Sequence, residues 1–260
     1  MTAHNSKAAS SVANQTVDIH HADGVATLTI TRPDCRNALD PATYQALSAA
    51  LKAADADTSI HAIIITGAQG HFTAGNDLRA FQAASTGARA GMDFLHTLVT
   101  IDTPIIAAVE GSAVGIGVTL LLHCDFVYVA EDAKLRLPFV SLGLCPEGAS
   151  SLLLAKMVGM RTASDWLLSA RMFSGTEAAS AGLATASAPA GGTLAQAQET
   201  GAHLARQPRA ALRLTKAMQR EPLREAITHT LNFESEQFGE RLKSPEAQAA
   251  FAAFFAKPPR

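Results

Sequence analysis

The sequence has few cysteines and few aromatic residues, and it has no marked excess of charge of either sign. Its three cysteines show no Cys-x-x-Cys spacing, which argues against a disulfide framework and indicates reduced thiols in a cytoplasmic protein. The formal net charge is −2, which argues against a nucleic-acid partner because phosphate-binding surfaces need an excess of Lys and Arg. Aromatic residues make up 5% of the chain, so we expect no aromatic cage in a binding pocket.

Long apolar runs are absent as well. No stretch of 18 apolar residues is free of charge, so we expect no transmembrane helix and no membrane partner. Residues 1–16 are rich in Ser, Ala and Asn without hydrophobic periodicity, which predicts a disordered tail. The chain is nevertheless 48% hydrophobic, enough to bury one core. We therefore expect a core domain over residues 17–200 and a helical C-terminal region over residues 201–260.

Short apolar segments predict an α/β fold. Residues 25–30 alternate as a half-buried strand does, whereas 61–66, 105–109 and 126–130 are apolar on both faces. The second pattern is typical of parallel sheets that helices cover on both sides. Asp40-Pro41 predicts the start of a helix that runs to about residue 54. No strand is predicted after Leu137, and the later helices are expected over 150–158, 163–169, 176–181, 194–207, 208–220, 222–238 and 245–255.

Two junctions between a strand and a helix are rich in small residues. The first covers residues 70–78 and follows the strand 61–66, and the second covers residues 110–118 and follows the strand 105–109. Backbone N–H groups can approach a ligand closely at such junctions, and two of them side by side could hold one oxygen atom in an oxyanion hole. The segment 81–92 is rich in Gly and Ala and is expected to form a mobile lid of the pocket.

The stretch Phe72-Thr-Ala-Gly-Asn-Asp-Leu78 followed by Ile106-Ala-Ala-Val-Glu-Gly-Ser-Ala-Val-Gly-Ile-Gly117 resembles the crotonase (enoyl-CoA hydratase/isomerase) superfamily. The resemblance extends over about residues 17–256. It implies a spiral of ββα units with a helical C-terminal trimerisation region, and so a homotrimer or a dimer of trimers. It also implies an acyl-CoA thioester as substrate, with coenzyme A as part of the substrate and with no separate cofactor or metal ion.

The resemblance also implies which residues act. The backbone N–H groups of Ala74 and Ile116 would bind the thioester oxygen, and the loop from Arg32 to Leu39 is similar to the first loop that contacts CoA. The residues expected to contact substrate or CoA are Cys35, Arg36, Ala38, Ala74, Gly75, Asn76, Asp77, Leu78, Gly115, Ile116, Thr119, Phe139 and Leu142. We expect Asp77 to cap the helix that begins near Leu78.

The residues that move protons decide the type of reaction. At the two positions where the family's hydratases have glutamates, this chain has Thr119 and Phe139, which argues against hydration because water addition needs both a base and an acid. Leu142-Gly-Leu-Cys-Pro-Glu-Gly148 instead resembles the monofunctional peroxisomal-type Δ3,Δ2-enoyl-CoA isomerases. In that branch a single glutamate takes a proton from C2 and returns it to C4, and Glu147 stands at its position. Apolar neighbours are expected to raise its pKa.

Other interpretations stay open. Glu147 could be an ordinary acid in the first turn of a helix, Cys145 could be a nucleophile, and Glu110 could be a second acid or a residue of the rim. Arg213 and Lys216 could contact the CoA phosphates. The alternative functions are an enoyl-CoA hydratase or other enolate chemistry in the same site, and a non-catalytic acyl-CoA-binding scaffold.

Overall fold

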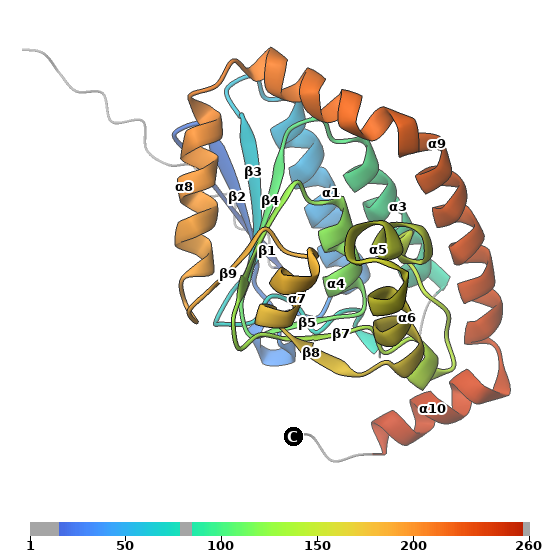
Figure 1. The fold of residues 1–260 in the computed structure, drawn as a ribbon. Helices are drawn as coiled ribbons and strands as arrows, with labels where there is room; N and C mark the ends of the chain where they lie inside the picture. The colour runs from blue at the N-terminus through green and yellow to red at the C-terminus, as the bar shows by residue number, and fades with distance from the viewer. Residues whose placement is uncertain (1–15, 79–84, 257–260) are drawn as a thin grey trace, which may run out of the picture.

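The computed structural model describes residues 16–78 and 85–256, and the side chains of 85–88 are not described. The expected N-terminal tail therefore lies, apart from Thr16, outside the described residues. The fold is of the α/β class, as predicted, with a central sheet between helices and a long helix along one side (Figure 1).

The central sheet has the strand order β1-β2-β3-β4-β6-β9. An antiparallel hairpin of β1 (Val17–Ala22) and β2 (Val25–Ile30) forms one edge. The other pairs are parallel and join β2 to β3 (Ala62–Gly67), β4 (Ile105–Val109), β6 (Phe126–Ala130) and β9 (Ala186–Ala188). The parallel pairing expected from the strands at 61–66, 105–109 and 126–130 is thus confirmed.

The two faces of the sheet belong to different cores, which explains why β3 and β4 carry apolar residues on both faces. Ile63 and Ala107 face the larger core, which includes buried residues of α1 (Pro41–Ala56) and α3 (Ser85–Thr100). Ile64 and Ile106 face a smaller core beneath α8 (Thr193–Ala205). Both faces are covered, so neither strand can alternate between apolar and polar residues.

A second sheet and several short helices connect these layers. The small sheet has the order β5 (Ser112–Val114), β7 (Lys134–Arg136) and β8 (Met172–Ser174). The remaining elements are η1 (Pro33–Cys35), α4 (Ile116–Thr119), η2 (Leu120–His123), η3 (Val140–Leu142), α5 (Ser150–Val158), α6 (Met160–Ser169), α7 (Gly175–Ala181), α9 (Arg209–Leu242) and α10 (Pro245–Phe255). As predicted, α1 begins after Asp40, whose side chain accepts from the N–H of Thr43.

Two predictions of local structure are wrong, and the predicted lid stays a prediction. Strands do occur after Leu137, but β8 and β9 span only three residues each, too few for periodicity to reveal them. The helices expected over 208–220 and 222–238 form one helix, α9, which continues through Pro222. Of the expected lid, residues 81–84 lie outside the described residues, and residues 85–92 form the first half of α3.

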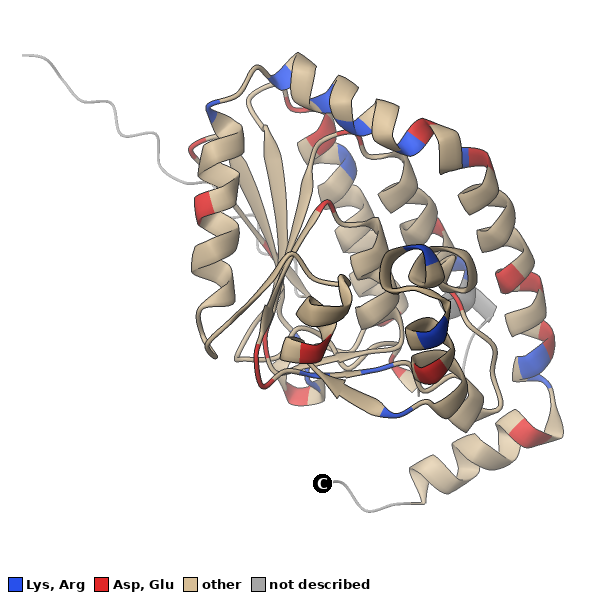
Figure 2. Cartoon of the chain, in the orientation of Figure 1, with Lys and Arg blue, Asp and Glu red and all other residues tan. Residues whose placement is uncertain are grey.

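Ion pairs attach the first half of α9 to the rest of the fold. Lys216, which is 5% exposed, pairs with Asp125 at 2.8 Å, and Arg220 pairs with the same carboxylate at 2.9 Å. Arg213 pairs with Asp55 at 2.5 Å. Several of the basic residues that recur along the first half of α9 (Figure 2) therefore form ion pairs within the protein. Because Arg213 and Lys216 are among them, the structure contradicts a role of these two residues in CoA binding. Within the described residues, no helix is both long and apolar enough to span a membrane.

Candidate active site

The two glycine-containing junctions lie side by side, as predicted. The N–H of Thr73 donates to the carbonyl oxygen of Ser112 at 3.0 Å, and the N–H of Val114 donates back to Thr73 at 3.2 Å. Gly75 lies so close to the second loop that a Cβ atom there would be 2.4 Å from the carbonyl oxygen of Val114. Its φ of +86° also favours glycine. A side chain at position 75 would therefore separate the two loops.

The backbone geometry changes the assignment of one oxyanion donor. The N–H of Ala74 donates to the carbonyl oxygen of Arg36 at 2.9 Å, so Ala74 is not free to bind a substrate oxygen. The N–H of Leu39 donates to the carbonyl oxygen of Gly75, and the N–H of Asp77 donates to the carbonyl oxygen of Leu39. Leu39 and Asn76 thus form a parallel β-bridge in which Leu39 bonds to the two neighbours of Asn76. Asn76 therefore directs its own N–H away from Leu39. Sequence reasoning missed this donor because only the pairing with Leu39 reveals which N–H is free.

Ile116 is placed as expected for the second donor. It is the first residue of α4, after Gly115, whose φ is +55°. The N–H groups in the first turn of a helix have no carbonyl partner within the helix. Val118 and Thr119 donate to the carbonyl oxygen of Gly115, so the N–H of Ile116 is left at the start of the turn. The side chain of Ile116 is buried, at 1% exposure.

Glu147 directs its carboxylate into the protein rather than into solvent. Its Oε1 atom is buried and has no hydrogen-bond partner within the described part of the chain. The side chain of Asn76 forms a hydrogen bond with Glu147. Burial, and after it the charge of Glu234, raise the pKa of Glu147 to about 8, against the weaker lowering effect of this hydrogen bond. The interpretation of Glu147 as an ordinary acid in the first turn of a helix is wrong, because α5 begins at Ser150 and has no acidic residue in its first turn.

A residue that the sequence analysis did not consider holds Asn76 in place. The hydroxyl group of Tyr44, on α1, donates to Oδ1 of Asn76 at 2.5 Å, and Tyr44 is 1% exposed. Because the Oδ1 atom of Asn76 accepts this hydrogen bond, the NH2 group of the same side chain is oriented to donate to the carboxylate of Glu147. A tyrosine inside an amphipathic helix gives no signal of this role, because its partner is 32 residues away.

The residues at the positions of the hydratase glutamates are both buried. Thr119 is fully buried, and its Oγ1 atom has no hydrogen-bond partner among the described residues. It lies directly beneath the Glu147 loop, since a Cβ atom on Gly148 would be 2.7 Å from Oγ1 of Thr119. Phe139 is 4% exposed and belongs to the larger core. Its carbonyl oxygen accepts from the N–H of Leu144 at 2.9 Å.

The expected CoA-contacting residues fall into two groups. Arg36 is exposed, and Cys35 and Leu142 are half-buried, so these three can be reached from solvent. Ala38 is buried, and its carbonyl oxygen accepts from Arg32.

Asp77 and Leu78 complete the first loop. Asp77 pairs with Arg32 at 3.1 Å, and Leu78 is helical and half-buried against the larger core. This first loop is joined to the loop from Arg32 to Leu39. The N–H of Ala74 donates to the carbonyl oxygen of Arg36, and the N–H of Leu39 donates to that of Gly75.

Asn37, which the list of candidates omits, fastens these loops. It is fully buried, with a φ of +58°. Its side-chain amide donates to the carbonyl oxygens of Ala68 and His71, and its Oδ1 atom accepts from the N–H of Arg32. The left-handed backbone of Asn37 is one signal in its favour, because asparagine adopts this conformation more readily than most residues.

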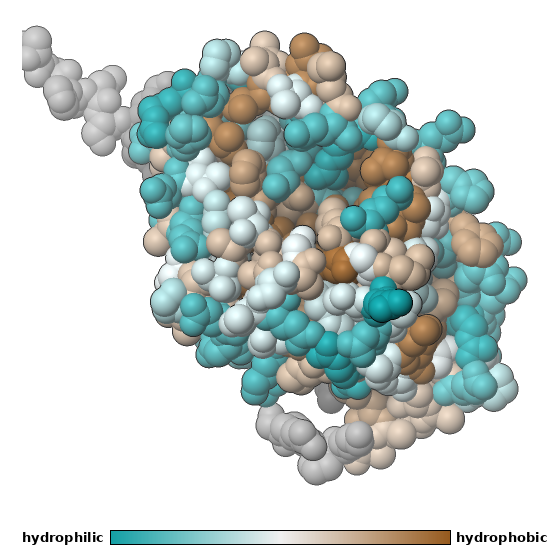
Figure 3. Space-filling model, in the orientation of Figure 1, coloured by the Kyte–Doolittle hydropathy of each residue, from teal (hydrophilic) through white to brown (hydrophobic). Residues whose placement is uncertain are grey.

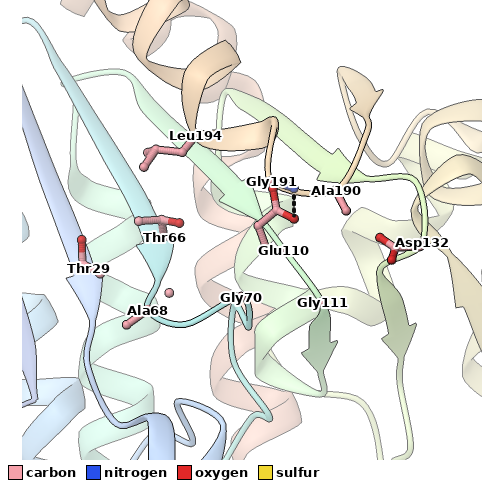
Figure 4. Close-up of a pocket in the computed structure, with 11 residues that line it drawn as sticks. Thr29, Thr66, Ala68, Gly70, Glu110, Gly111, Asp132, Ala190, Gly191 and Leu194 are labelled. Carbon is pink, nitrogen blue, oxygen red and sulfur yellow. Dashed lines mark hydrogen bonds between the residues drawn. The ribbon is translucent and has the colours of Figure 1, made fainter.

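The alternative catalytic residues have other partners. The carboxylate of Glu110 accepts from the N–H groups of Gly191 and Thr193 and from the hydroxyl group of Thr193, which stabilises the start of α8. Glu110 lines a surface hollow together with Thr66 and Asp132 (Figure 4), and none of the predicted site residues lines that hollow. Burial raises the pKa of the Cys145 thiol, so it stays protonated and is a poor nucleophile.

The chain matches the family model described as enoyl-CoA hydratase/isomerase over residues 20–259. It is 33% identical to the 2,3-dehydroadipyl-CoA hydratase of Escherichia coli over 88% of this chain and 91% of that protein. It is 36% identical to the enoyl-CoA delta isomerase 2 of Rattus norvegicus over 62% of this chain and 43% of that protein.

A solved structure agrees with these sequence relatives. The enoyl-CoA hydratase/isomerase of Pseudoalteromonas atlantica superposes with a TM-score of 0.89 at 36% identity, over 94% of this chain and 99% of that one. The loops with free backbone donors beside a buried glutamate are the parts that such an acyl-CoA enzyme needs. The chain belongs to the enoyl-CoA hydratase/isomerase family of the crotonase superfamily and is an acyl-CoA enzyme of that family.

Proposed function

We propose that this enzyme moves a double bond from Δ3 to Δ2 of an enoyl-CoA, with Glu147 as its single acid/base. The observation that carries the proposal is the buried carboxylate of Glu147, whose pKa is raised to about 8, beside two non-ionisable residues at the hydratase positions, Thr119 and Phe139. A relative named enoyl-CoA delta isomerase 2 supports this choice, whereas the hydratase names among the relatives favour the alternative.

The proposed reaction needs one carboxylate and two backbone donors. Oε1 of Glu147 takes the proton from C2, and the electron pair of that C–H bond passes through C1 to the thioester oxygen. The N–H groups of Asn76 and Ile116 stabilise the resulting dienolate. The protonated Glu147 then donates to C4, the carbonyl group re-forms, and the double bond lies between C2 and C3. One group serves as base and then as acid, so no second carboxylate is required.

The raised pKa suits this cycle. A carboxylate with a pKa of about 8 is a stronger base toward a weakly acidic C–H group than an exposed glutamate is, and its acid form can still return the proton. The cost is that only about a tenth of the molecules carry the ionised form at pH 7. We therefore expect the turnover of isomerisation to rise with pH toward about 8.

Two measurements separate the candidate reactions. One follows the conversion of a 3-enoyl-CoA to the conjugated 2-enoyl thioester by its absorbance, and the other follows the hydration of a 2-enoyl-CoA. We expect isomerisation to exceed hydration by at least about 100-fold, the contribution of one acid or base group. Faster hydration would favour the hydratase, and binding of an acyl-CoA with neither reaction would favour the non-catalytic scaffold.

The expected oligomer and location remain parts of this proposal. Large apolar side chains are exposed on α9 and α10, namely Leu214, Met218, Phe233 and Phe254. Their exposure supports a trimer formed through these two helices. Hydrophobic patches interrupt the polar surface on the α9 side of the molecule (Figure 3). Light scattering should give a multiple of three subunits. A cytoplasmic location is supported by the three free cysteines.

A further inference from the structure

A buried carboxylate on the C-terminal helix binds the chain segment that follows Glu147. Glu234 lies on α9 and is 4% exposed. Its Oε2 atom accepts from the N–H of Ala149 at 2.6 Å, and its Oε1 atom accepts from the N–H of Ser151 at 2.9 Å and from its hydroxyl group at 2.5 Å. All three donors come from two residues at the start of α5, which has no side-chain cap of its own. Glu234 supplies that cap from a distant part of the chain.

The segment that Glu234 holds has an unusual backbone. Gly148 has a φ of +72°, and Ala149 follows it with a φ of +57°, a left-handed conformation that residues with a Cβ atom rarely adopt. The side chain of His123 is hydrogen-bonded to the carbonyl oxygen of Gly148 at 2.9 Å. The turn that directs Glu147 into the site is therefore held from one side by His123 and from the other by Glu234.

The charge of Glu234 is not balanced by a neighbour in contact with it. Burial raises the pKa of Glu234, and the hydrogen bonds from Ser151 and Ala149 oppose this effect because they stabilise the ionised carboxylate. No basic side chain contributes to its pKa in the described part of the chain. Arg241, on the same helix, bonds to the carbonyl oxygen of Gly143 and pairs with Glu246. Next to burial, the charge of Glu234 is the second cause that raises the pKa of Glu147.

The other titratable groups around Glu147 are neutral near pH 7. Burial lowers the pKa of His123 to about 4 and raises the pKa values of Tyr44 and of the Cys145 thiol. The remaining neighbour, Asn76, does not titrate. Among the described residues, Glu234 is the charged side chain that contributes to the pKa of Glu147.

We propose that Glu234 is a positioning residue of the Glu147 site, which fixes the turn that carries Glu147 and whose negative charge favours the protonated form of Glu147. This inference rests on the proposed function, in which Glu147 moves the proton. It gives α9 a part in the chemistry, since a helix of the C-terminal region, 87 positions beyond Glu147 in the sequence, sets the state of the acid/base.

The test compares Glu234→Gln with Glu236→Gln, which removes an exposed carboxylate from the same helix. Glutamine keeps the size of the side chain and one accepting oxygen but not the charge. We expect Glu234→Gln to move the rising limb of kcat/KM against pH to lower pH by about one unit. Ser151→Ala, which removes one hydrogen bond and no charge, should leave the limb in place, as should Glu236→Gln. An unmoved limb in folded Glu234→Gln would overturn the proposal.

A second measurement needs no turnover. The infrared carboxyl band that is lost in Glu147→Gln reports the protonation of Glu147, and in Glu234→Gln this band should titrate at lower pH than in the wild type. If the band shifts while neither variant nor wild type isomerises a 3-enoyl-CoA, the positioning role stands and the proposed function fails. If Glu234→Gln does not fold, the carboxyl band of Glu234 is followed in Glu147→Gln, where Glu234 should already be ionised at pH 7. A Glu234 that stays protonated there up to pH 8 would overturn the proposal, because a neutral Glu234 has no charge with which to favour the protonated form of Glu147.

Discussion

Replacement of Glu147 by glutamine should change how the stability of the protein depends on pH. In the unfolded chain the carboxyl group ionises above its ordinary pKa of 4.5, whereas in the folded protein it stays protonated up to about pH 8. Between these values the folded state binds one more proton than the unfolded state, so stability falls as pH rises. The slope is about 1.4 kcal/mol per pH unit, or about 3–4 kcal/mol from pH 5 to pH 8.

Glu147→Gln carries no titrating group at this position, so its stability should lack this contribution. Urea unfolding at pH 5, 6, 7 and 8 should show the variant gaining about 3–4 kcal/mol on the wild type over this range. The matched control is Glu199→Gln, in which an exposed glutamate on α8 is replaced. Its stability should stay at a constant difference from the wild type. If the Glu147→Gln and wild-type curves run parallel, the carboxylate is not desolvated as the structure indicates.

Three further substitutions test the packing and polar contacts around the site. Gly148→Ala should cost about 2–4 kcal/mol in urea unfolding, because its Cβ would meet Thr119 at 2.7 Å in a left-handed backbone. Asp125→Asn should cost about 3–5 kcal/mol, because it leaves the buried ammonium group of Lys216 without its counter-charge. Tyr44→Phe should lower kcat for isomerisation about tenfold with little change in KM, because the amide that orients Glu147 loses its donor.

Matched controls separate these effects from the general effect of a substitution. Gly191→Ala also introduces a Cβ at a positive φ, of +82°, but into open space, so it should cost less than Gly148→Ala. Asp165→Asn breaks an exposed ion pair with Arg171 and should leave the urea midpoint almost unchanged. Equal costs in either pair of variants would contradict the structural reasoning. For Tyr44→Phe the contradicting result is an unchanged kcat.

Sequence patterns predicted those elements whose burial or capping depends on residues close together in the chain. The strands near residues 61–66 and 105–109 are apolar on both faces, and the structure places them between two cores. The cap at Asp40 is equally local, since its partner Thr43 is three residues away. The strands β8 and β9 were missed because three residues are too few for a period. The continuity of α9 through Pro222 was missed because a proline usually ends or kinks a helix.

The candidate site shows the same division. The two loops and Glu147 were recognised because each is carried by a continuous stretch of sequence. The assignment of the oxyanion donor to Ala74 was wrong because an N–H group is free or engaged according to a partner elsewhere, here Arg36. Tyr44 and Glu234 were missed for a related reason, since each acts on a residue more than 30 positions away.

The central claim is that Glu147 moves the proton, and the turnover of Glu147→Gln on a 3-enoyl-CoA tests it most directly. The formation of the conjugated thioester should be followed by absorbance, with the binding of a saturated acyl-CoA as the check that the site is intact. The loss of the acid/base group predicts a fall in kcat of about 10²–10⁴, with acyl-CoA binding retained. A folded Glu147→Gln protein that turns over within a few-fold of the wild type would contradict the claim.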